Sequence, residues 1–269
     1  MKNLIYQYWL GNTRPIGVNA GVENMKNYAE RIGAEYIFQT NPIWATNRCS
    51  YPQYYSAFEP IYNTDVFEQY DNILFADTDI FAVDDLEENI FDQELADIGI
   101  CRELHKEVTR GRGEGINNNK TDKLWNSWLQ NKYKKSMPLN DDGDMKVYNS
   151  GVVVYTKKGR EKARQNFRPF QEYIDLIRSS SLSKFYQLDQ NYLHAMLTIA
   201  DMDVTEMDPG WNTYIHYAGN AREVPRPVFD GRDHWNAKLT HVQLRGADHH
   251  DAAWHHTIVN KPQSEWKLP

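Results

Sequence analysis

The chain has 269 residues, of which 41% are apolar and 25% are charged, a balance typical of a soluble globular protein. Its length allows one large domain or two small ones. Every apolar run falls short of the ~20 residues that a membrane-spanning helix needs. The first ten residues are too short and too aromatic for a secretory signal, and no small-residue cleavage site follows them. The sequence therefore predicts neither export nor a membrane span.

The charge balance is acidic, with 30 Lys and Arg against 37 Asp and Glu and a net charge of −7. Nucleic-acid-binding proteins usually carry a basic surface that neutralises phosphates, so we expect no nucleic-acid partner. Two cysteines, Cys49 and Cys101, cannot form a disulfide framework in a chain of this length. We therefore predict a reducing compartment, the cytoplasm.

Predicted strands and helices alternate along the chain. Strands are predicted over residues 4–9, 35–38, 72–76, 97–101, 147–155 (interrupted at 149–151) and 202–207. Helices are predicted over residues 22–32 (capped by Gly33), 52–70 (interrupted at Pro60), 121–133, 159–179 and 186–200. This alternation indicates an α/β fold with a mainly parallel central sheet flanked by helices.

No repeat or low-complexity linker divides the chain, so a single domain over residues 1–269 is predicted, with the His- and Trp-rich residues 247–269 packing on it. Ligands of open α/β sheets bind at the carboxyl ends of strands. Asp77 and Asn149 are both expected at such ends. Two irregular segments, 107–120 and 225–235, are candidates for lids over the site.

The strongest chemical signal is the pair Asp77 and Asp79, directly after the apolar strand at 72–76. Two carboxylates one residue apart can converge on a hard divalent cation, which in turn can bind phosphates. The alternative is a turn in which both aspartates accept backbone N–H groups. Ile80 and Phe81 follow the pair, which excludes a calcium-binding loop.

Several motifs then follow in a fixed order: Asp77-Thr78-Asp79, Tyr148-Asn149-Ser150-Gly151-Val152-Val153-Val154, Leu188-Asp189-Gln190-Asn191-Tyr192-Leu193, Trp211-Asn212 and His241. In this order they resemble the D-x-D, F-N-[SA]-G, D-Q-[DN], W-N and C-terminal histidine motifs of GT-A glycosyltransferases, most closely the glycogenin-like and galactosyltransferase-like family 8. The resemblance covers residues 1 to about 246. It implies a GT-A fold, a Rossmann-like fold that binds nucleotide sugars.

The resemblance also implies a metal cofactor, Mn²⁺ or Mg²⁺, held by Asp77, Asp79 and His241. Bound there, the ion would act as a Lewis acid on the diphosphate of a nucleotide sugar. UDP is the favoured carrier and GDP the alternative. From the residues alone, His241 has a second interpretation as a hydrogen-bonded core histidine.

The catalytic positions that the resemblance implies are Asn149, Asp189 and Gln190, which would line the donor sugar and the acceptor. The alternatives are a strand-end amide for Asn149 and a helix N-cap for Asp189. Thr78 and Tyr8 are predicted donor contacts, the latter together with Tyr6 and residues 40–44 near the base and ribose. Core packing is an equal alternative for these aromatic residues.

One segment departs from the family pattern. Where the family has H-F-x-G-x-x-K-P-W, this chain has His241-Val242-Gln243-Leu244-Arg245-Gly246. The lysine that would meet the diphosphate is missing, so Arg245, or else Lys238, is predicted to replace it. Further on, Asp251 and His255 share a helical face at i, i+4 spacing, which fits either a zinc site or a solvated helix.

The leading hypothesis is a metal-dependent hexosyl- or pentosyltransferase that moves a sugar to a glycan or other hydroxyl acceptor, with retention of configuration as the family implies. A non-catalytic protein that binds nucleotide sugars or glycans is one alternative. A Mg²⁺-dependent phosphohydrolase or nucleotidyltransferase is another, although residues 11–15 make a poor phosphate loop.

Overall fold

The structure is a computed structural model that describes residues 1–14, 16–83, 86–103, 119–141, 143–218, 226–229 and 237–243. Its strands are β1 (Asn3–Trp9), β2 (Glu35–Thr40), β3 (Asn72–Ala76), β4 (Ile80–Ala82), β5 (Ile98–Arg102), β6 (Tyr148–Thr156), β7 (Val204–Glu206), β8 (Thr213–Ala218), β9 (Arg226–Phe229) and β10 (Leu239–Gln243). Its α-helices are α1 (Ile16–Arg31), α2 (Pro52–Tyr55), α3 (Glu59–Tyr62), α4 (Thr64–Phe67), α6 (Asn119–Tyr133), α7 (Lys157–Asn166), α8 (Phe170–Arg178) and α9 (Asp189–Ile199). Short 3₁₀ turns are η1 (Ser56–Phe58), η2 (Ile90–Asp92), η3 (Lys184–Gln187) and η4 (Pro209–Asn212).

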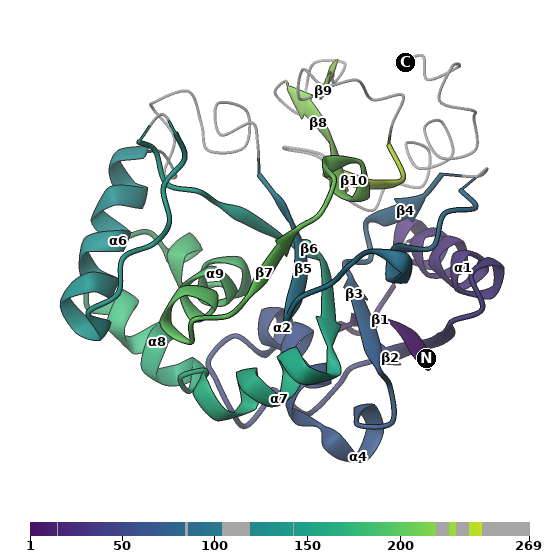
Figure 1. The fold of residues 1–269 in the computed structure, drawn as a ribbon, viewed down its shortest axis with the longest axis horizontal. Helices are drawn as coiled ribbons and strands as arrows, with labels where there is room; N and C mark the ends of the chain where they lie inside the picture. The colour runs from purple at the N-terminus through teal and green to yellow at the C-terminus, as the bar shows by residue number, and fades with distance from the viewer. Residues whose placement is uncertain are drawn as a thin grey trace.

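The central sheet has six strands in the order β2-β1-β3-β6-β5-β7 (Figure 1). Three pairings are parallel, β1 with β2, β1 with β3 and β5 with β7, whereas β6 runs antiparallel to both β3 and β5. This confirms the predicted α/β fold with a mostly parallel sheet. The reversal of β6 also corrects one expectation: Asn149 lies near the start of its strand, beside the edge where β3 ends, and not at a carboxyl end.

The sheet separates two hydrophobic cores by strict alternation of its side chains. Leu4 and Tyr6 of β1 face one core, together with the helices α6, α8 and α9, while Ile5 faces the other core with α1. The same alternation holds in β3 and β6, and Figure 1 shows α1 on one side of the sheet and α6, α8 and α9 on the other. Strands buried on both faces produce nearly continuous apolar runs, which makes them readable from the sequence.

A second sheet, in the order β4-β10-β8-β9, lies beyond the carboxyl end of β3. Its strand β4 follows β3 after a short turn and pairs antiparallel with β10. The sequence predicts no strand at residues 80–82, because three apolar residues are too few to establish a period. This pairing carries a distant part of the chain to the edge of the central sheet.

For three predicted elements, the sequence places a break where the structure has none or misses a break that the structure has. The strand predicted over 147–155 is not interrupted: β6 runs through Asn149, Ser150 and Gly151. The helix predicted over 159–179 is two helices, because Pro169 lacks an N–H donor and holds the preceding residue out of the helical region. The helix predicted over 186–200 also breaks, at the extended Leu188.

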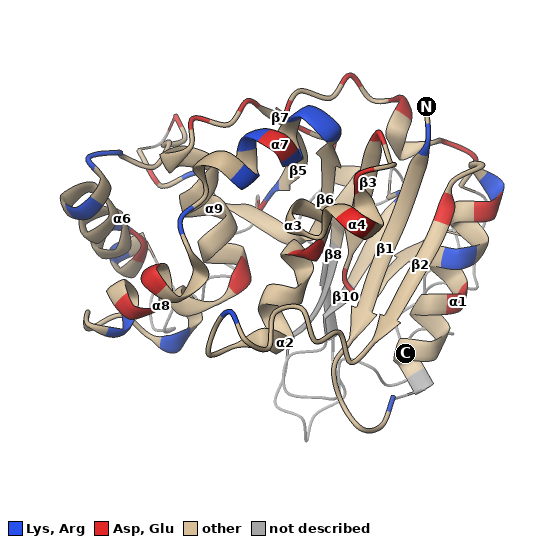
Figure 2. Cartoon of the chain, turned by 90° about the horizontal axis from the view of Figure 1, so that it is seen from below, with Lys and Arg blue, Asp and Glu red and all other residues tan. Residues whose placement is uncertain are grey.

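The N-terminal helix begins earlier than predicted, at Ile16, and Gly33 follows it with a positive φ of 68°, as expected for a helix cap. The helical pattern over 52–70 is a series of short helices and turns, with Pro60 in the first turn of α3. Acidic and basic side chains are interspersed on α1, α6, α7 and α8 (Figure 2). Within the described ranges, every helix is too short or too polar to cross a bilayer.

Candidate functional site

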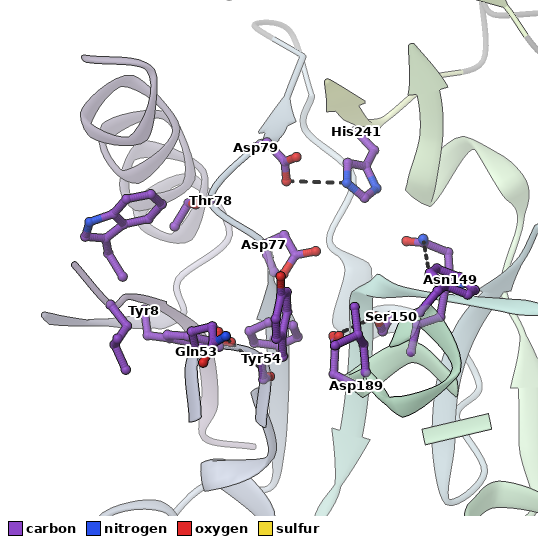
Figure 3. Close-up of a pocket in the computed structure, with 17 residues that line it drawn as sticks. Tyr8, Gln53, Tyr54, Asp77, Thr78, Asp79, Asn149, Ser150, Asp189 and His241 are labelled. Carbon is purple, nitrogen blue, oxygen red and sulfur yellow. Dashed lines mark hydrogen bonds and ion pairs between the residues drawn. The ribbon is translucent and has the colours of Figure 1, made fainter. Parts of the chain in front are cut away.

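A cleft of about 470 Å³ opens at the edge where β3 ends and β6 begins. Its lining comprises Tyr8, Trp9, Leu10, Gln53, Tyr54, Phe75, Ala76, Asp77, Thr78, Asp79, Asn149, Ser150, Phe185, Leu188, Asp189, Gln190 and His241 (Figure 3). Eight of the nine predicted site residues therefore lie together in one cavity. The ninth, Arg245, lies outside the described residues. The roles assigned to these residues stay predictions.

The turn that carries the two aspartates is held by backbone contacts from three directions. The Asp77 N–H donates to the carbonyl of Gly151 at 2.9 Å, and the Ile80 N–H donates to the Asp77 carbonyl at 3.1 Å. That carbonyl also accepts a 2.9 Å bond from Nε2 of the buried Gln7, which in turn accepts one from Tyr36. The backbone of Asp77 is thus fixed without using its carboxylate.

His241 reaches the aspartates through the second sheet. It pairs with Ile80 across β10 and β4, so its imidazole stands beside the residue just before Ile80, which is Asp79. His241 Nε2 lies 3.4 Å from Oδ1 of Asp79, and ligand atoms of Asp77, Asp79 and His241 all lie within 4.8 Å of one another (Figure 3). We call these three residues the acidic cluster.

Burial makes the acidic cluster electrostatically unfavourable without a cation. Burial raises the pKa of Asp77 well above its usual range, and the charge of Asp79 raises it further. Burial alone would lower the pKa of His241, which is 1% exposed, but the facing Asp79 and Asp77 raise it above its ordinary value. A divalent cation would relieve the repulsion between the two carboxylates and take the place of the proton on the imidazole.

Two glycines allow the close approaches that this arrangement needs. A Cβ at Gly151 would lie 2.7 Å from Cε1 of His241 and 3.0 Å from a carboxylate oxygen of Asp77. A Cβ at Gly21, on α1, would lie 2.2 Å from the carbonyl oxygen of Thr78. Larger residues would push α1 away from the aspartate turn, or His241 away from Asp77.

On the other side of the cleft, three amides bond in series. Nδ2 of Asn212 donates to Oδ1 of Asn149 at 2.7 Å, and Nδ2 of Asn149 donates to Oε1 of Gln190 at 3.1 Å. The backbone N–H of Gly151 also donates to Oδ1 of Asn149, which fixes the orientation of that amide. Oε1 of Gln190 is engaged by the bond from Asn149, and its Nε2 is buried without a partner among the described residues. We call Asn212, Asn149 and Gln190 the amide series.

Asp189 stands beside the amide series at the start of α9. Its Oδ2 accepts a 3.1 Å bond from the hydroxyl of Ser150, and burial raises its pKa to about 6 despite that bond. The N-cap of α9 is Leu188, without a side-chain cap bond, so Asp189 is the first helical residue and not the cap. Its carboxylate accepts backbone N–H groups of Asp189 and Gln190, and the residue lines the cleft.

The two tyrosines of β1 that are predicted to contact the donor lie at different depths. Tyr8 lines the cleft, but its hydroxyl donates to the backbone carbonyls of Gln53 and Tyr54, so only its ring remains for a ligand. Tyr6 is fully buried one pleat earlier on the same face, so its predicted contact with base or ribose is wrong. Residues 40–44 do not line the cleft.

Five cleft residues are not among the predicted site residues or their motifs: Trp9, Leu10, Gln53, Tyr54 and Phe185. For Trp9 and Leu10 the available signal is their place at the carboxyl end of β1. Gln53, Tyr54 and Phe185 reach the cleft because tertiary packing brings their segments to it. Lys238 lies elsewhere, with its ammonium paired with Glu88 and over the ring of Trp211. Most of the two lid candidates, 107–120 and 225–235, and the tail with Asp251 and His255 lie outside the described residues.

Comparisons with known proteins agree with the fold. A family model described as glycosyl transferase family 8 matches residues 23–234, which is more than half of the chain. No curated protein matches. Similar solved structures are those of a glycosyltransferase involved in glycosylation of the major capsid of PBCV-1 (TM-score 0.52, 11% identity, covering 93% of this chain and 95% of that one), of mouse xyloside xylosyltransferase 1 (0.47, 12%, 92% and 100%) and of galactosyltransferase LgtC with donor and acceptor sugar analogues (0.45, 14%, 78% and 75%). The similarity to the first of these structures, with a TM-score of 0.52, shows a shared fold.

Proposed function

This chain belongs to glycosyl transferase family 8, and from that premise we propose that it transfers a sugar from a nucleoside diphosphate sugar to a hydroxyl of a glycan or another acceptor. The enzyme is a glycosyltransferase. The finer parts of the proposal are UDP as the favoured carrier, a divalent cation in the cleft, and retention of configuration. The free thiols of Cys49 and Cys101 support a reducing compartment, the cytoplasm.

The acidic cluster is the observation that carries the proposal. Two carboxylates and an imidazole within 4.8 Å of one another form a donor set for one ion. Carboxylate oxygens suit both Mg²⁺ and Mn²⁺. An imidazole ligand favours Mn²⁺ over Mg²⁺, because imidazole binds transition metals better. When bound, such an ion supplies the Lewis acidity that stabilises a leaving nucleoside diphosphate.

The other side of the cleft orients the donor sugar. Asp189, whose pKa is about 6, is ionised at neutral pH and accepts hydrogen bonds from the sugar hydroxyls. Gln190 lies beside Asp189 in the lining, and its amide is held by the bond from Asn149. Bonds fixed in this way position a reacting sugar without reorganisation during the reaction.

The diphosphate needs a cation besides the metal ion, and Arg245 is our proposed residue for that contact. Lys238 is less suitable, since its ammonium is already paired with Glu88. Tyr8 contributes the face of its ring to the base or ribose, while its hydroxyl holds the segment that carries Gln53 and Tyr54.

The test is a panel of UDP- and GDP-sugars, each with Mn²⁺ or Mg²⁺ and candidate acceptor glycans, assayed for release of the nucleoside diphosphate. We expect release from at least one donor, and loss of that release with a chelator and in Asp77→Asn. Asp65→Asn removes an exposed carboxylate from α4 and serves as the matched control. Release that persists in a chelator would overturn the metal site, and calorimetry without binding of any nucleoside diphosphate would overturn the donor class.

A further inference from the structure

A second cavity, of about 410 Å³, lies between the segment after β2 and the segment that joins α7 to α8. It is lined by Trp44, Arg48, Tyr62, Phe167, Arg168, Pro169 and Phe170, none of which lines the cleft. Its volume falls in the ~300–1,000 Å³ range of small-molecule sites. The catalytic proposal makes no use of it.

Two arginines give this cavity a positive charge in a chain whose net charge is −7. Arg48 donates from Nη1 to the carbonyl of Trp44 at 2.8 Å and lies over that indole ring, which leaves most of its five N–H donors available. Arg168 makes no side-chain hydrogen bond or ion pair with any residue in the described ranges. Arg164 and Arg178 nearby differ, since each pairs with a carboxylate. The described lining contains no Asp or Glu, so the pair of guanidinium groups attracts an anion.

The rest of the lining is apolar, and its aromatic rings pack against one another. The rings of Trp44 and Tyr62 stack at 5.4 Å, and Phe170 meets Trp44 edge-on at 5.9 Å. Phe167 and Phe170 are 9% and 6% exposed, so they form a fixed floor and not a loose surface. A small inorganic anion would leave the apolar floor uncovered, and a purely apolar ligand would not satisfy the charge of the two arginines. The lining therefore suits a small ligand that has an apolar face and one acidic group.

A short stretch of chain connects this cavity to the cleft. Arg48 lines the cavity and Gln53 lines the cleft, and five residues of chain span at most about 18 Å. Between them, Ser50 donates from its N–H and its hydroxyl to Gln171, and Tyr51 donates to Gln187. The separation of the two cavities along this segment is thus no more than the length of a few sugar units.

We propose that this cavity binds an acidic sugar unit of the acceptor glycan, carrying a carboxylate or a phosphate, a few units from the hydroxyl that receives the transferred sugar. That the glycan is an acceptor rests on the proposed function. Arg48 and Arg168 hold the acidic group through charge-assisted hydrogen bonds. Phe167, Pro169 and Phe170 pack against the C–H face of the ring.

The test measures binding to the full chain without donor or metal, so it does not depend on catalysis. Calorimetric titrations would use glucuronic acid and glucose 6-phosphate as probes, with glucose and inorganic phosphate as controls. We expect both acidic sugars to bind at least about tenfold more tightly than either control. Arg48→Gln and Arg168→Gln should each weaken binding about tenfold or more, since each removes a charged hydrogen bond. Arg178→Gln, on α8 but outside the cavity, is the matched control and should leave binding unchanged.

Three results would overturn the proposal. Inorganic phosphate that binds as tightly as the acidic sugars would indicate an anion site without sugar recognition. Binding that survives both arginine substitutions would place the ligand elsewhere. Binding to vesicles of phosphatidylglycerol without binding to soluble acidic sugars would indicate a membrane-contact surface. Failure of the catalytic proposal is distinguishable, because it would abolish turnover with every donor and leave these titrations as expected.

Discussion

On one side of the cleft, the acidic cluster brings two carboxylates and an imidazole together where burial and like charge oppose it. On the other side, the amide series bonds its side chains to one another and to the backbone of Gly151. The acidic cluster therefore depends on an ion to become favourable, whereas the amide series is already held in place when a ligand arrives. Removal of the metal ion should therefore act on the acidic cluster, and loss of a neighbouring side chain on the amide series.

The largest effect is expected from Asp79→Asn. It removes one of the two carboxylates that hold the ion, and loss of several kcal/mol of Lewis-acid stabilisation lowers turnover roughly a hundredfold or more. The fold should persist, because a like charge beside Asp77 is removed and no cavity forms. We expect the thermal midpoint without metal to change by less than about 4 °C. Turnover above a tenth of the wild-type value at saturating Mn²⁺ would contradict the metal role.

His241→Ala separates a metal ligand from a core histidine. The pKa of His241 is raised above its ordinary value of ~6.5, so the imidazole must lose a proton before it can bind metal. Wild-type Mn²⁺ affinity should therefore fall as the pH drops through and below that raised pKa. The variant should bind Mn²⁺ about tenfold more weakly and with a flatter pH profile. Parallel profiles, measured by titration calorimetry, would leave His241 structural.

Asn212→Ala tests the amide series without touching the cleft. Asn212 is 4% exposed and reaches the site only through Asn149, which keeps its bond from Gly151 in the variant. Without the hydrogen bond from Asn212, Asn149 is held less firmly, and the transition state should lose about 1–1.5 kcal/mol of stabilisation. That loss should lower kcat roughly tenfold. Mn²⁺ affinity should stay within about twofold of wild type, because Asn212 bonds to Asn149 and not to the acidic cluster. An equal loss of metal affinity would show that the two sides are not independent.

The smallest effect is expected from Ser150→Ala. The Ser150 hydroxyl stabilises the ionised carboxylate of Asp189 and so lowers its pKa, which burial has raised to about 6. Removing the hydroxyl should raise that pKa by about one unit and move the acid limb of kcat/KM to higher pH. Ser150→Thr keeps a hydroxyl and should restore the wild-type limb. An unmoved limb in both variants would assign it to another group.

Much of the fold and most of the composition of the site can be predicted from the sequence. Continuous apolar runs mark the strands of the central sheet. The carboxylate pair after one of them leads to Asp77 and Asp79, and the ordered family motifs lead to Asn149, Asp189 and His241. The break at Pro169 is also readable, since proline ends a helix at the residue before it. The sequence prediction is wrong there because the helical spacing on both sides of the proline favours one continuous helix.

Other features cannot be predicted from local pattern. The direction of β6 leaves no trace in the sequence, because a strand buried on both faces has the same apolar run in either direction. The pairing of β4 with β10 joins residues about 160 positions apart through only three residue pairs. Gln53 and Tyr54 line the cleft because Tyr8 binds their carbonyls, a contact that no periodicity encodes.

The reversed β6 has a consequence for the timescale on which the site can change. Asn149, Ser150 and Gly151 directly precede residues 152–155 of β6, which pair with β3 on one side and, from 153 on, with β5 on the other, so their position depends on the part of the sheet that opens last. Amide protons of the paired residues 152–155 should exchange at the slowest rates in the molecule. Substrate-driven rearrangement is therefore left to the segments around the cleft, and relatives with other acceptors should differ there while β6 keeps its geometry.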